Sequence, residues 1–318
     1  MTPTPSQLTR AHTFQALHHA ERGFLLPNAW DAASARIFEA AGFPALGTTS
    51  AGIAYARGRR DGQNLTRAEM CREVANIVDA VGVPVNADIE AGYGDAPANV
   101  ARSVAEFVAV GAVGLNLEDA TGRPQEPLYA LEDQQRRLAA ARRAADATGL
   151  PIYLNARTDT YLSGFGQSDE ARLAETIRRG RAYLEAGADS LFIPLLTDPA
   201  TIRRLRQELG GPVTVMAFPG APSVPTLLDA GATRVSLGQG AMLAALGQIA
   251  RLAGELRDTG TYGAMGAAFY GFSEAEALFG ARQAPPNERD THPTEVPHGA
   301  AVQTPTGVCP QEKTARGK

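Results

Sequence analysis

The chain of 318 residues has little cysteine, and it contains no long apolar run. Its two cysteines, Cys71 and Cys309, cannot build a disulfide framework, which predicts a protein of the reducing cytoplasm. No stretch approaches the ~20 apolar residues that span a bilayer, and the N-terminus lacks the apolar core of a secretion signal. A net charge of −4 disfavours nucleic acids and anionic membranes as partners. We therefore expect neither partner.

Histidine is also scarce. His12, His18 and His19 lie in a polar segment near the N-terminus, and His292 and His298 lie near the C-terminus. This distribution leaves no histidine on the strands predicted below, so it excludes a catalytic triad built on histidine.

Four stretches repeat one theme, in which a run of small apolar residues ends at glycine and a β-rich stretch follows. A helix that ends at glycine and turns into a buried strand explains each of them. Repeated helix–strand units indicate a parallel sheet, and eight of them indicate a closed barrel. The four stretches are AAGFPALGTTS (40–50), AVGAVGLNLED (109–119), EAGADSLFIPL (185–195) and DAGATRVSLG (229–238).

Eight strands can be assigned along the chain, with helices of suitable length between them. The length of the chain suits one such domain, since barrels of this kind need about 250 residues. We therefore predict an α/β fold, a (β/α)8 barrel of the TIM type. The predicted strands are 23–28, 44–50, 83–90, 112–118, 151–158, 188–194, 212–218 and 232–238.

The C-terminal part divides into an apolar helical stretch and a polar tail. After the eighth strand come a helix at about 240–257 and an apolar, aromatic stretch, although the barrel is already closed. We expect these extra helices to pack on another subunit, which predicts a homo-oligomer. Residues 1–282 form the predicted barrel domain with its additional helices. Residues 283–318, rich in proline, threonine and charge, are predicted to be a disordered tail.

Polar residues gather near the C-terminal ends of three neighbouring strands. Side chains alternate along a strand, so Asp88 and Glu90 share one face, and Glu118 and Arg157 share the faces of Asn116 and Asn155. Buried carboxylates cost several kcal/mol each unless they are compensated. A divalent cation would offset that cost, and oxygen-only ligands favour Mg²⁺ or Mn²⁺. A structural salt-bridge cluster around Arg157 is the alternative.

Two glycine-containing turns are further candidates. TTSAG (48–52) ends the second strand with hydroxyl groups and backbone N–H groups that suit a substrate carboxylate, although an ordinary turn explains it as well. GQGAM (238–242) follows the eighth strand and opens a helix, where many barrels bind phosphate. A tight turn with helix capping is the simpler explanation.

Five segments occur in order along the chain: PNAWDAASARIFEAAGFPAL, TTSAG, VNADIEAGYGD, LNLED and NARTD, with Asp61 in a loop after the second. In this ordered set the chain resembles the isocitrate lyase / phosphoenolpyruvate mutase superfamily. The resemblance runs from about residue 20 to 260. It implies a Mg²⁺ enzyme on a (β/α)8 barrel that breaks or forms C–C or P–C bonds next to a 2-oxo acid through an enolate. It also implies a dimer or tetramer in which a C-terminal helix is swapped between subunits.

The resemblance assigns roles to individual positions. It implies that Asp88, Glu90 and Glu118 form the metal site, with Glu118 acting through metal-bound water. It implies catalytic roles for Asp61, Glu118 and Arg157. Arg157 would also bind the substrate, together with Thr49, Ser50 and Gly52 in the segment that holds the substrate carboxylate.

The chain also departs from the family pattern. Lyases of this family carry a Lys-Lys/Arg-Cys-Gly-His loop soon after the fourth strand, but here residues 119–133 read DATGRPQEPLYALED and contain no Cys, Lys or His. Cleavage of isocitrate or methylisocitrate by the usual mechanism is therefore not expected.

We expect a Mg²⁺-dependent C–C lyase or decarboxylase that acts on a small 2-oxo acid or dicarboxylate. Oxaloacetate decarboxylation suits a chain without the cysteine loop. P–C mutase or hydrolase chemistry and a non-catalytic ligand-binding barrel are the alternatives.

Overall fold

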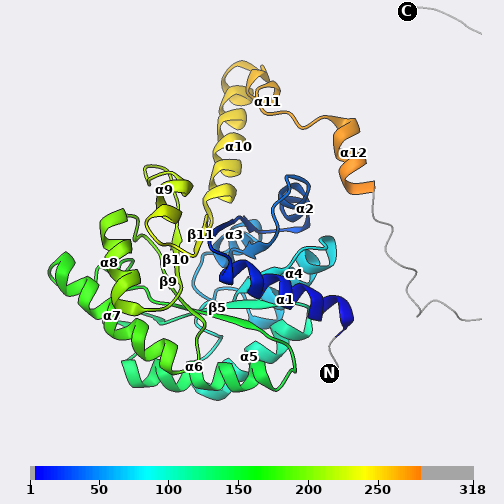
Figure 1. Ribbon diagram of the computed structural model, residues 1–318. Helices are drawn as coiled ribbons and strands as arrows, with labels where there is room; N and C mark the ends of the chain where they lie inside the picture. The colour runs from blue at the N-terminus through cyan, green and yellow to red at the C-terminus, as the bar shows by residue number, and fades with distance from the viewer. Residues whose placement is uncertain (1–3, 281–318) are drawn as a thin grey trace, which may run out of the picture. The chain divides into compact units, whose positions relative to one another are not determined.

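The computed structural model describes residues 4–280, and all of them except Gly280 belong to one unit, Met1–Phe279. Its centre is a parallel sheet of nine strands in the order β1-β11-β10-β9-β8-β5-β4-β3-β2 (Figure 1). β1 and β2 are two halves of the first strand, which is interrupted at Pro27, and Pro has no N–H to continue the ladder. Counted together they give eight strand positions, which confirms the predicted (β/α)8 barrel.

All strands of the barrel are short, and each one lies inside or at the edge of a range predicted from the sequence. A separate antiparallel hairpin, β6–β7, follows β5. The barrel strands are β1 (Phe24–Leu26), β2 (Asn28–Ala29), β3 (Leu46–Thr48), β4 (Val85–Asp88), β5 (Gly114–Glu118), β8 (Tyr153–Arg157), β9 (Ser190–Ile193), β10 (Val213–Met216) and β11 (Arg234–Ser236), and the hairpin strands are β6 (Ala120–Arg123) and β7 (Glu126–Leu128).

Helices follow most strands and surround the sheet, as Figure 1 shows for α4 to α8. Many begin at a side-chain cap; Thr66 and Glu69, for example, form a capping box at the start of α4. The helices are α1 (Pro5–His19), α2 (Ala32–Ala40), α3 (Ser50–Ala56), α4 (Arg67–Ala80), α5 (Pro97–Ala109), α6 (Leu131–Asp146), α7 (Asp169–Glu185), α8 (Pro199–Leu209), α9 (Val224–Asp229), α10 (Gly240–Thr259), α11 (Gly263–Gly266) and α12 (Phe272–Gly280).

The side chain of Asn28 joins the first and last strands at the pocket end of the barrel. Its Nδ2 donates to the carbonyl oxygen of Thr48 at 3.0 Å, and its Oδ1 accepts from the N–H groups of Leu237 and Gly238 at 2.8 and 3.0 Å. One buried amide thus satisfies three backbone groups where the broken first strand leaves the ladder incomplete.

The opposite end of the barrel is closed by α1. Phe14 is fully buried there, and a Cβ on Gly114 would lie 2.4 Å from its ring, so only glycine lets the helix approach β5 so closely. His18 stacks on Tyr153 with ring centroids 3.6 Å apart, and its Nε2 lies 3.4 Å from Arg234 on β11. Burial and the neighbouring Arg234 lower the pKa of His18 to about 3, so the ring is neutral.

His18 corrects one expectation. It lies in a helix that reads as polar, yet the side chain is buried against the barrel strands. The sequence did not reveal this because only two of the four side chains on the buried face of α1, Ala11 and Phe14, are apolar, and Gln7 and His18 complete that face.

The C-terminal helices bury little. Met242 is the single buried residue of α10, and α10 extends away from the sheet in Figure 1. Packing or swapping with another subunit stays a prediction, and the predicted tail (283–318) lies outside the described residues. Among the described helices, none has the length and apolar content of a membrane span. A cytoplasmic location stays a prediction.

Candidate active site

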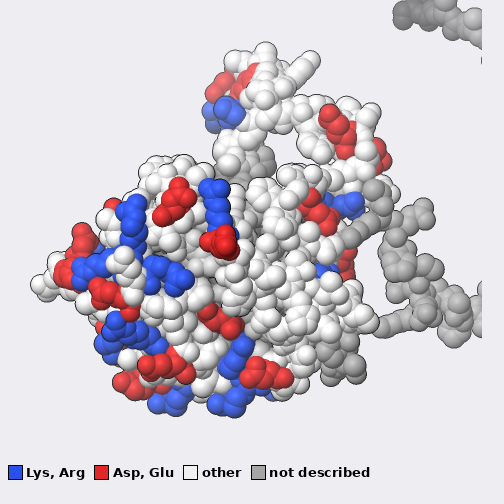
Figure 2. All heavy atoms as spheres, in the orientation of Figure 1, with Lys and Arg blue, Asp and Glu red and all other residues white. Residues whose placement is uncertain are grey.

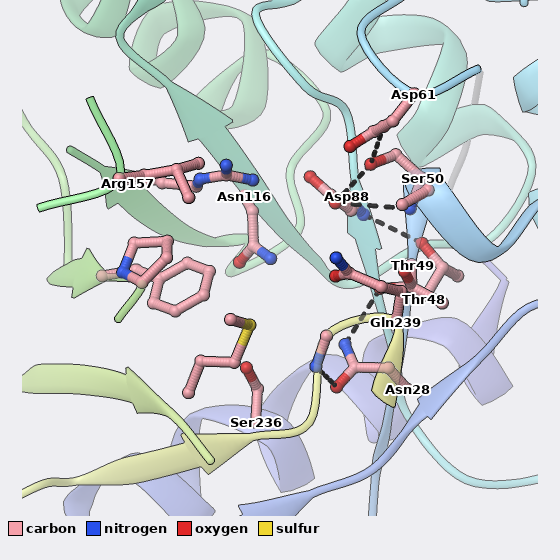
Figure 3. Close-up of a pocket in the computed structure, with 16 residues that line it drawn as sticks. Asn28, Thr48, Thr49, Ser50, Asp61, Asp88, Asn116, Arg157, Ser236 and Gln239 are labelled. Carbon is pink, nitrogen blue, oxygen red and sulfur yellow. Dashed lines mark hydrogen bonds between the residues drawn. The ribbon is translucent and has the colours of Figure 1, made fainter. Parts of the chain in front are cut away.

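A cavity of about 90 Å³ lies at the C-terminal ends of the barrel strands, where TIM-type barrels carry their active sites. Its lining is largely polar, with an apolar side formed mainly by residues from β9, β10 and the loop after β8 (Figure 3). The lining residues are Asn28, Thr48, Thr49, Ser50, Ala51, Asp61, Asp88, Asn116, Arg157, Leu162, Phe192, Pro194, Met216, Ser236, Gly238 and Gln239.

Asp88, the last residue of β4, forms one wall of the pocket. Its Oδ2 accepts from Ser50 Oγ at 2.9 Å and from the Ser50 N–H at 3.4 Å, and its own N–H donates to Thr48 Oγ1 at 2.9 Å. Ser50 Oγ also lies 3.4 Å from Asp61 Oδ1, so one hydroxyl group stands between two carboxylates (Figure 3). Burial and the charge of Asp88 raise the pKa of Asp61.

Arg157, the last residue of β8, faces Asp88 across the pocket. Its Nε and one terminal nitrogen donate to Asp159 at 2.6 and 2.9 Å, and its other terminal nitrogen lies 2.8 Å from Glu118. Burial opposes the charge of Arg157, but Asp159 and Glu118 raise its pKa well above the usual value. Three of the five guanidinium N–H groups are therefore engaged, and two remain for a ligand.

The pKa of Glu118 is also raised. Burial raises its pKa well above the usual value, Arg157 lowers it, and the carboxylates of Asp159 and Asp88 raise it further. The salt-bridge cluster and the ligand-binding role proposed for Arg157 are thus compatible, because the same guanidinium pairs with carboxylates and lines the pocket.

Glu90 lies beyond the end of β4 and turns away from the pocket. Its backbone is in the left-handed region, with φ of 48°, so the alternation of the strand does not reach it. Its carboxylate accepts from the N–H of Gln63 and, at 3.1 Å, from Tyr93 Oη. Burial and the charge of Asp88 raise its pKa to about 7. Glu90 thereby ties the loop that carries Asp61 to the end of β4.

A second buried network lies outside the sheet and supports the ends of β5 and β8. Asp119 Oδ1 accepts from the N–H of Asp159 at 2.9 Å, and its Oδ2 accepts from Thr158, Arg179 and Tyr183 at 2.7–3.1 Å. Because Asp159 in turn grips Arg157, helix α7 helps to fix the orientation of Arg157.

Of the predicted site residues, the structure gathers Thr49, Ser50, Asp61, Asp88 and Arg157 around one cavity. Glu118 and Glu90 stand behind this lining, and Gly52 lies inside α3, where its N–H donates to Thr49 Oγ1. The prediction that Asp88, Glu90 and Glu118 bind one metal ion therefore stays a prediction.

Several lining residues were not identified as candidates: Asn28, Ser236 and the apolar Leu162, Phe192, Pro194 and Met216. Asn116 was assigned to the inward face but given no role. Ser236 and Asn28 could have been identified as candidates from the sequence, because both lie near the ends of predicted strands. The turn at 238–242 does contribute Gly238 and Gln239 to the pocket, although phosphate binding there is untested.

The hairpin β6–β7 occupies the place of the lyase cysteine loop, and none of its residues lines the cavity. It is tied to the loop after β4, where Tyr129 Oη and Arg123 both donate to Asp95. Cys71 is buried in α4 outside the lining, and burial raises the pKa of its thiol to about 11. This thiol is not placed for acid–base work in the pocket.

Within residues 4–280, no group of three or more His, Cys, Asp or Glu side chains is arranged to hold a metal ion by itself. Mg²⁺ does not need such a cage, because it retains several waters and often binds one or two carboxylates. Burial raises the pKa values of Asp61, Glu90 and Glu118, and the charge of Asp88 raises them further. This donor set, oxygen only and rich in negative charge, fits a hydrated divalent cation.

Comparison with known proteins is consistent with this geometry. Residues 14–257 match the family model for phosphoenolpyruvate phosphomutase. The chain belongs to this family, within the isocitrate lyase / phosphoenolpyruvate mutase superfamily. It is 30% identical over 229 residues to an oxaloacetate decarboxylase of Bradyrhizobium diazoefficiens, covering 69% of this chain and 75% of that protein. It is 37% identical over 232 residues to an uncharacterised Mycobacterium tuberculosis protein, covering 71% and 81%.

Solved structures show the same fold. A Burkholderia cenocepacia protein described as a lyase/mutase has 41% identity and a TM-score of 0.81, covering 86% of this chain and 96% of that one. A phosphonopyruvate hydrolase in complex with oxalate and Mg²⁺ has 25% identity and a TM-score of 0.73, covering 88% and 95%. The chain is thus an enzyme of a superfamily of lyases and mutases.

The raised pKa of Glu90 predicts a pH-dependent stability. A folded-state pKa of about 7 lies above the usual 4.5, so the wild type should lose stability as pH rises from about 4.5 through 7, by up to about 3 kcal/mol. Glu90→Gln keeps the shape and removes the titration. In EDTA, urea unfolding should show the variant more stable than wild type at pH 8, with no such gain at pH 5.

The exposed Glu126→Gln change, at a side chain that is 74% accessible, is the control and should give no pH-dependent difference. An equal effect of Glu90→Gln at both pH values would contradict the assigned titration.

Proposed function

We propose that this enzyme is a Mg²⁺-dependent C–C lyase or decarboxylase that acts on a small 2-oxo acid or dicarboxylate, with oxaloacetate decarboxylation as the leading candidate. The observation that carries the proposal is the placement of Asp88 and Arg157 on opposite sides of one small, polar cavity. A substrate with two anionic ends can meet a cation at the first and a guanidinium at the second.

Asp88 is the residue best placed to hold the metal ion. Glu118 would hold the metal-bound water; burial raises its pKa, and the charges of Asp159, Asp88 and Glu90 raise it further. Once bound, the ion would supply a Lewis acid for the 2-oxo and carboxylate oxygens. The Mg²⁺ in the related hydrolase supports this assignment. Mn²⁺ would satisfy the same oxygen ligands.

The protein's own groups then divide the remaining work. Arg157 holds a substrate carboxylate with its two unused N–H groups, and Thr49 and Ser50 place hydroxyl groups in the lining. When the C3–C4 bond of a 3-carboxy-2-oxo acid breaks, its electron pair passes to the enolate and CO₂ leaves. A proton must then return to C3. Asp61, whose pKa is raised, can carry that proton, and so can water.

Phosphonate chemistry of the mutase type is the second candidate, favoured by the family model itself. A metaphosphate-like species would have to be shielded from water, and the hairpin β6–β7 does not contribute to the lining. Decarboxylation has no such requirement, so we rank it first.

The metal assignment predicts that Asp88→Asn abolishes catalysis. Pyruvate release from oxaloacetate should require added Mg²⁺ and should stop in EDTA, and calorimetry should show weaker Mg²⁺ binding to the variant. Mg²⁺ also promotes decarboxylation without enzyme, so each rate is corrected for a reaction without protein. The control variant is Asp229→Asn, which alters an exposed aspartate beside Arg22. Equal Mg²⁺ affinity in Asp88→Asn and wild type would refute the assignment. A panel of 2-oxo acids, 2-hydroxy dicarboxylates and phosphonates identifies the substrate.

The role of Arg157 predicts a loss that is specific to turnover. Arg157→Lys cannot reproduce the two-point grip on Asp159 and a substrate carboxylate. We expect kcat/KM to fall by ~2–4 kcal/mol in transition-state free energy, as for loss of one oxyanion donor. The control is Arg204→Lys, which alters an exposed ion pair with Glu170 outside the pocket and should leave turnover unchanged. Arg157 is only structural if Arg157→Lys loses Tm while turnover per folded molecule is retained.

We also propose that the C-terminal helices pack against a second copy of this chain. Ten of the sixteen exposed large apolar side chains among the described residues lie between Leu243 and Phe279. Charged residues are sparse on the face of this region shown in Figure 2, whereas acidic and basic groups alternate over the helices around the barrel. Exposed apolar side chains grouped in one region in this way are typical of an interface.

This second proposal predicts a dimer or tetramer in sedimentation velocity. The double change Ile249→Glu and Phe272→Glu, at side chains that are 61% and 81% exposed, should shift the protein toward monomer because it buries two charges in the interface. The control pair Leu8→Glu and Ile37→Glu lies on α1 and α2 and should leave the assembly intact. A monomeric wild type at micromolar concentration would exclude this interface.

A further inference from the structure

Three asparagines from neighbouring strands form a polar layer directly under the pocket. Asn86 on β4 and Asn155 on β8 are fully buried, and Asn116 on β5 is 6% exposed. The Oδ1 of Asn116 accepts from Asn86 Nδ2 at 3.1 Å and from Asn155 Nδ2 at 2.8 Å. It accepts a third hydrogen bond, of 2.9 Å, from a terminal nitrogen of Arg234 on β11. Three donors thus converge on one amide oxygen.

Arg234 decides the direction of these hydrogen bonds. It is 1% exposed, and no carboxylate forms an ion pair with it in the described part of the chain. Its second terminal nitrogen contacts Asn86 Oδ1 at 3.3 Å. An amide can be turned over to exchange its oxygen and nitrogen, but a guanidinium can only donate. The atoms of Asn116 and Asn86 that face Arg234 must therefore be oxygens.

The other end of the Asn116 amide is fixed by the same logic. With its oxygen held by three donors, its Nδ2 must face away from them, and Asn116 is a lining residue of the cavity. In Figure 3 its amide group projects into the space bordered by Arg157, Ser236 and Gln239. No described residue accepts a hydrogen bond from this nitrogen, so a donor stands ready in the floor of the pocket.

We propose that Asn116 Nδ2 donates a hydrogen bond to a substrate oxygen, and that Arg234 is the positioning residue that keeps the amide in this orientation. The proposal rests on the proposed function, since it places an anionic oxo acid in this cavity. It adds a specificity rule: the substrate atom above Asn116 must be an acceptor, such as a carboxylate, carbonyl or enolate oxygen. An amine or ammonium group there would face a donor, so a ligand that carries one at this point should bind more weakly.

Oxalate and oxamate test this rule, because they differ by one oxygen replaced with an NH₂ group. Calorimetric titrations with Mg²⁺ present should show that the wild type binds oxalate at least tenfold more tightly than oxamate. In Asn116→Asp, both carboxylate oxygens accept, so one faces the pocket whichever way the group turns. The oxalate-to-oxamate affinity ratio should then fall at least tenfold. Asn116→Leu supplies neither donor nor acceptor and should weaken oxalate without favouring oxamate.

Arg234→Met tests whether Arg234 orients the Asn116 amide or only stabilises the fold. Without the guanidinium the Asn116 amide can turn over, so the affinity ratio should fall although Asn116 itself is intact, whereas a structural defect would weaken both probes alike. Asp88→Asn, by contrast, should weaken both probes without changing their ratio. A wild type that binds oxalate, together with unchanged ratios in folded Asn116→Asp and Arg234→Met, overturns this inference alone. A wild type that binds neither probe overturns it together with the proposed function.

A crystal structure of the wild type with oxalate keeps the inference testable if the variants do not fold. It should place an oxalate oxygen within about 3.2 Å of Asn116 Nδ2. Oxalate bound elsewhere in the cavity, with no oxygen at that distance, overturns the inference.

Discussion

Arg157 is held by Asp159 through two hydrogen bonds and by Glu118 at 2.8 Å, and the pocket depends on this one buried guanidinium. Five carboxyl groups gather at this end of the barrel, at positions 61, 88, 90, 118 and 159. Burial is the largest cause of the raised pKa values of Asp61, Glu90 and Glu118, and neighbouring carboxylates raise them further, so one guanidinium does not balance the acidic groups at this end of the barrel. An apolar packing solution would have been more stable for the barrel alone. The charge excess is therefore best understood as prepared for ligands that are not part of the chain.

The strands end in these carboxylates, but the surrounding helices hold them in place. Arg137 on α6 donates to the backbone carbonyls of Gly94 and Asp95 and so secures the loop after β4. Asp119, gripped by Arg179 of α7, secures the loop after β8. Each network satisfies backbone groups that would otherwise be buried without partners. The helices thus support the pocket end of the barrel from outside, while Asn116 Nδ2 has no acceptor among the described residues and remains available inside the cavity.

The sequence predicted the barrel because four stretches repeat a helix that ends at glycine and turns into a strand, and because eight short strands alternate with helices. Strand alternation placed Asp88 and Arg157 toward one pocket, and both line the cavity because the alternation holds up to the last strand residue. It could not place Glu90, since one residue in the left-handed region, two positions after the strand, redirects the side chain. It also gave Asn116 no role, because the direction of an amide depends on Arg234, 118 residues away. Which end of an amide side chain faces a donor that is distant in the sequence cannot be read from the neighbouring residues.

Helix α10 has two ends with different surroundings. Gln239, its N-cap residue, lines the cavity, and Met242 anchors the first turn beside α3. The remaining turns carry the exposed apolar side chains. The same helix thus runs from the pocket wall to the exposed apolar side chains. If its far turns pack on a second subunit, as proposed above, one continuous hydrogen-bonded element joins that subunit to the cavity, and a shift of the helix axis would displace Gln239.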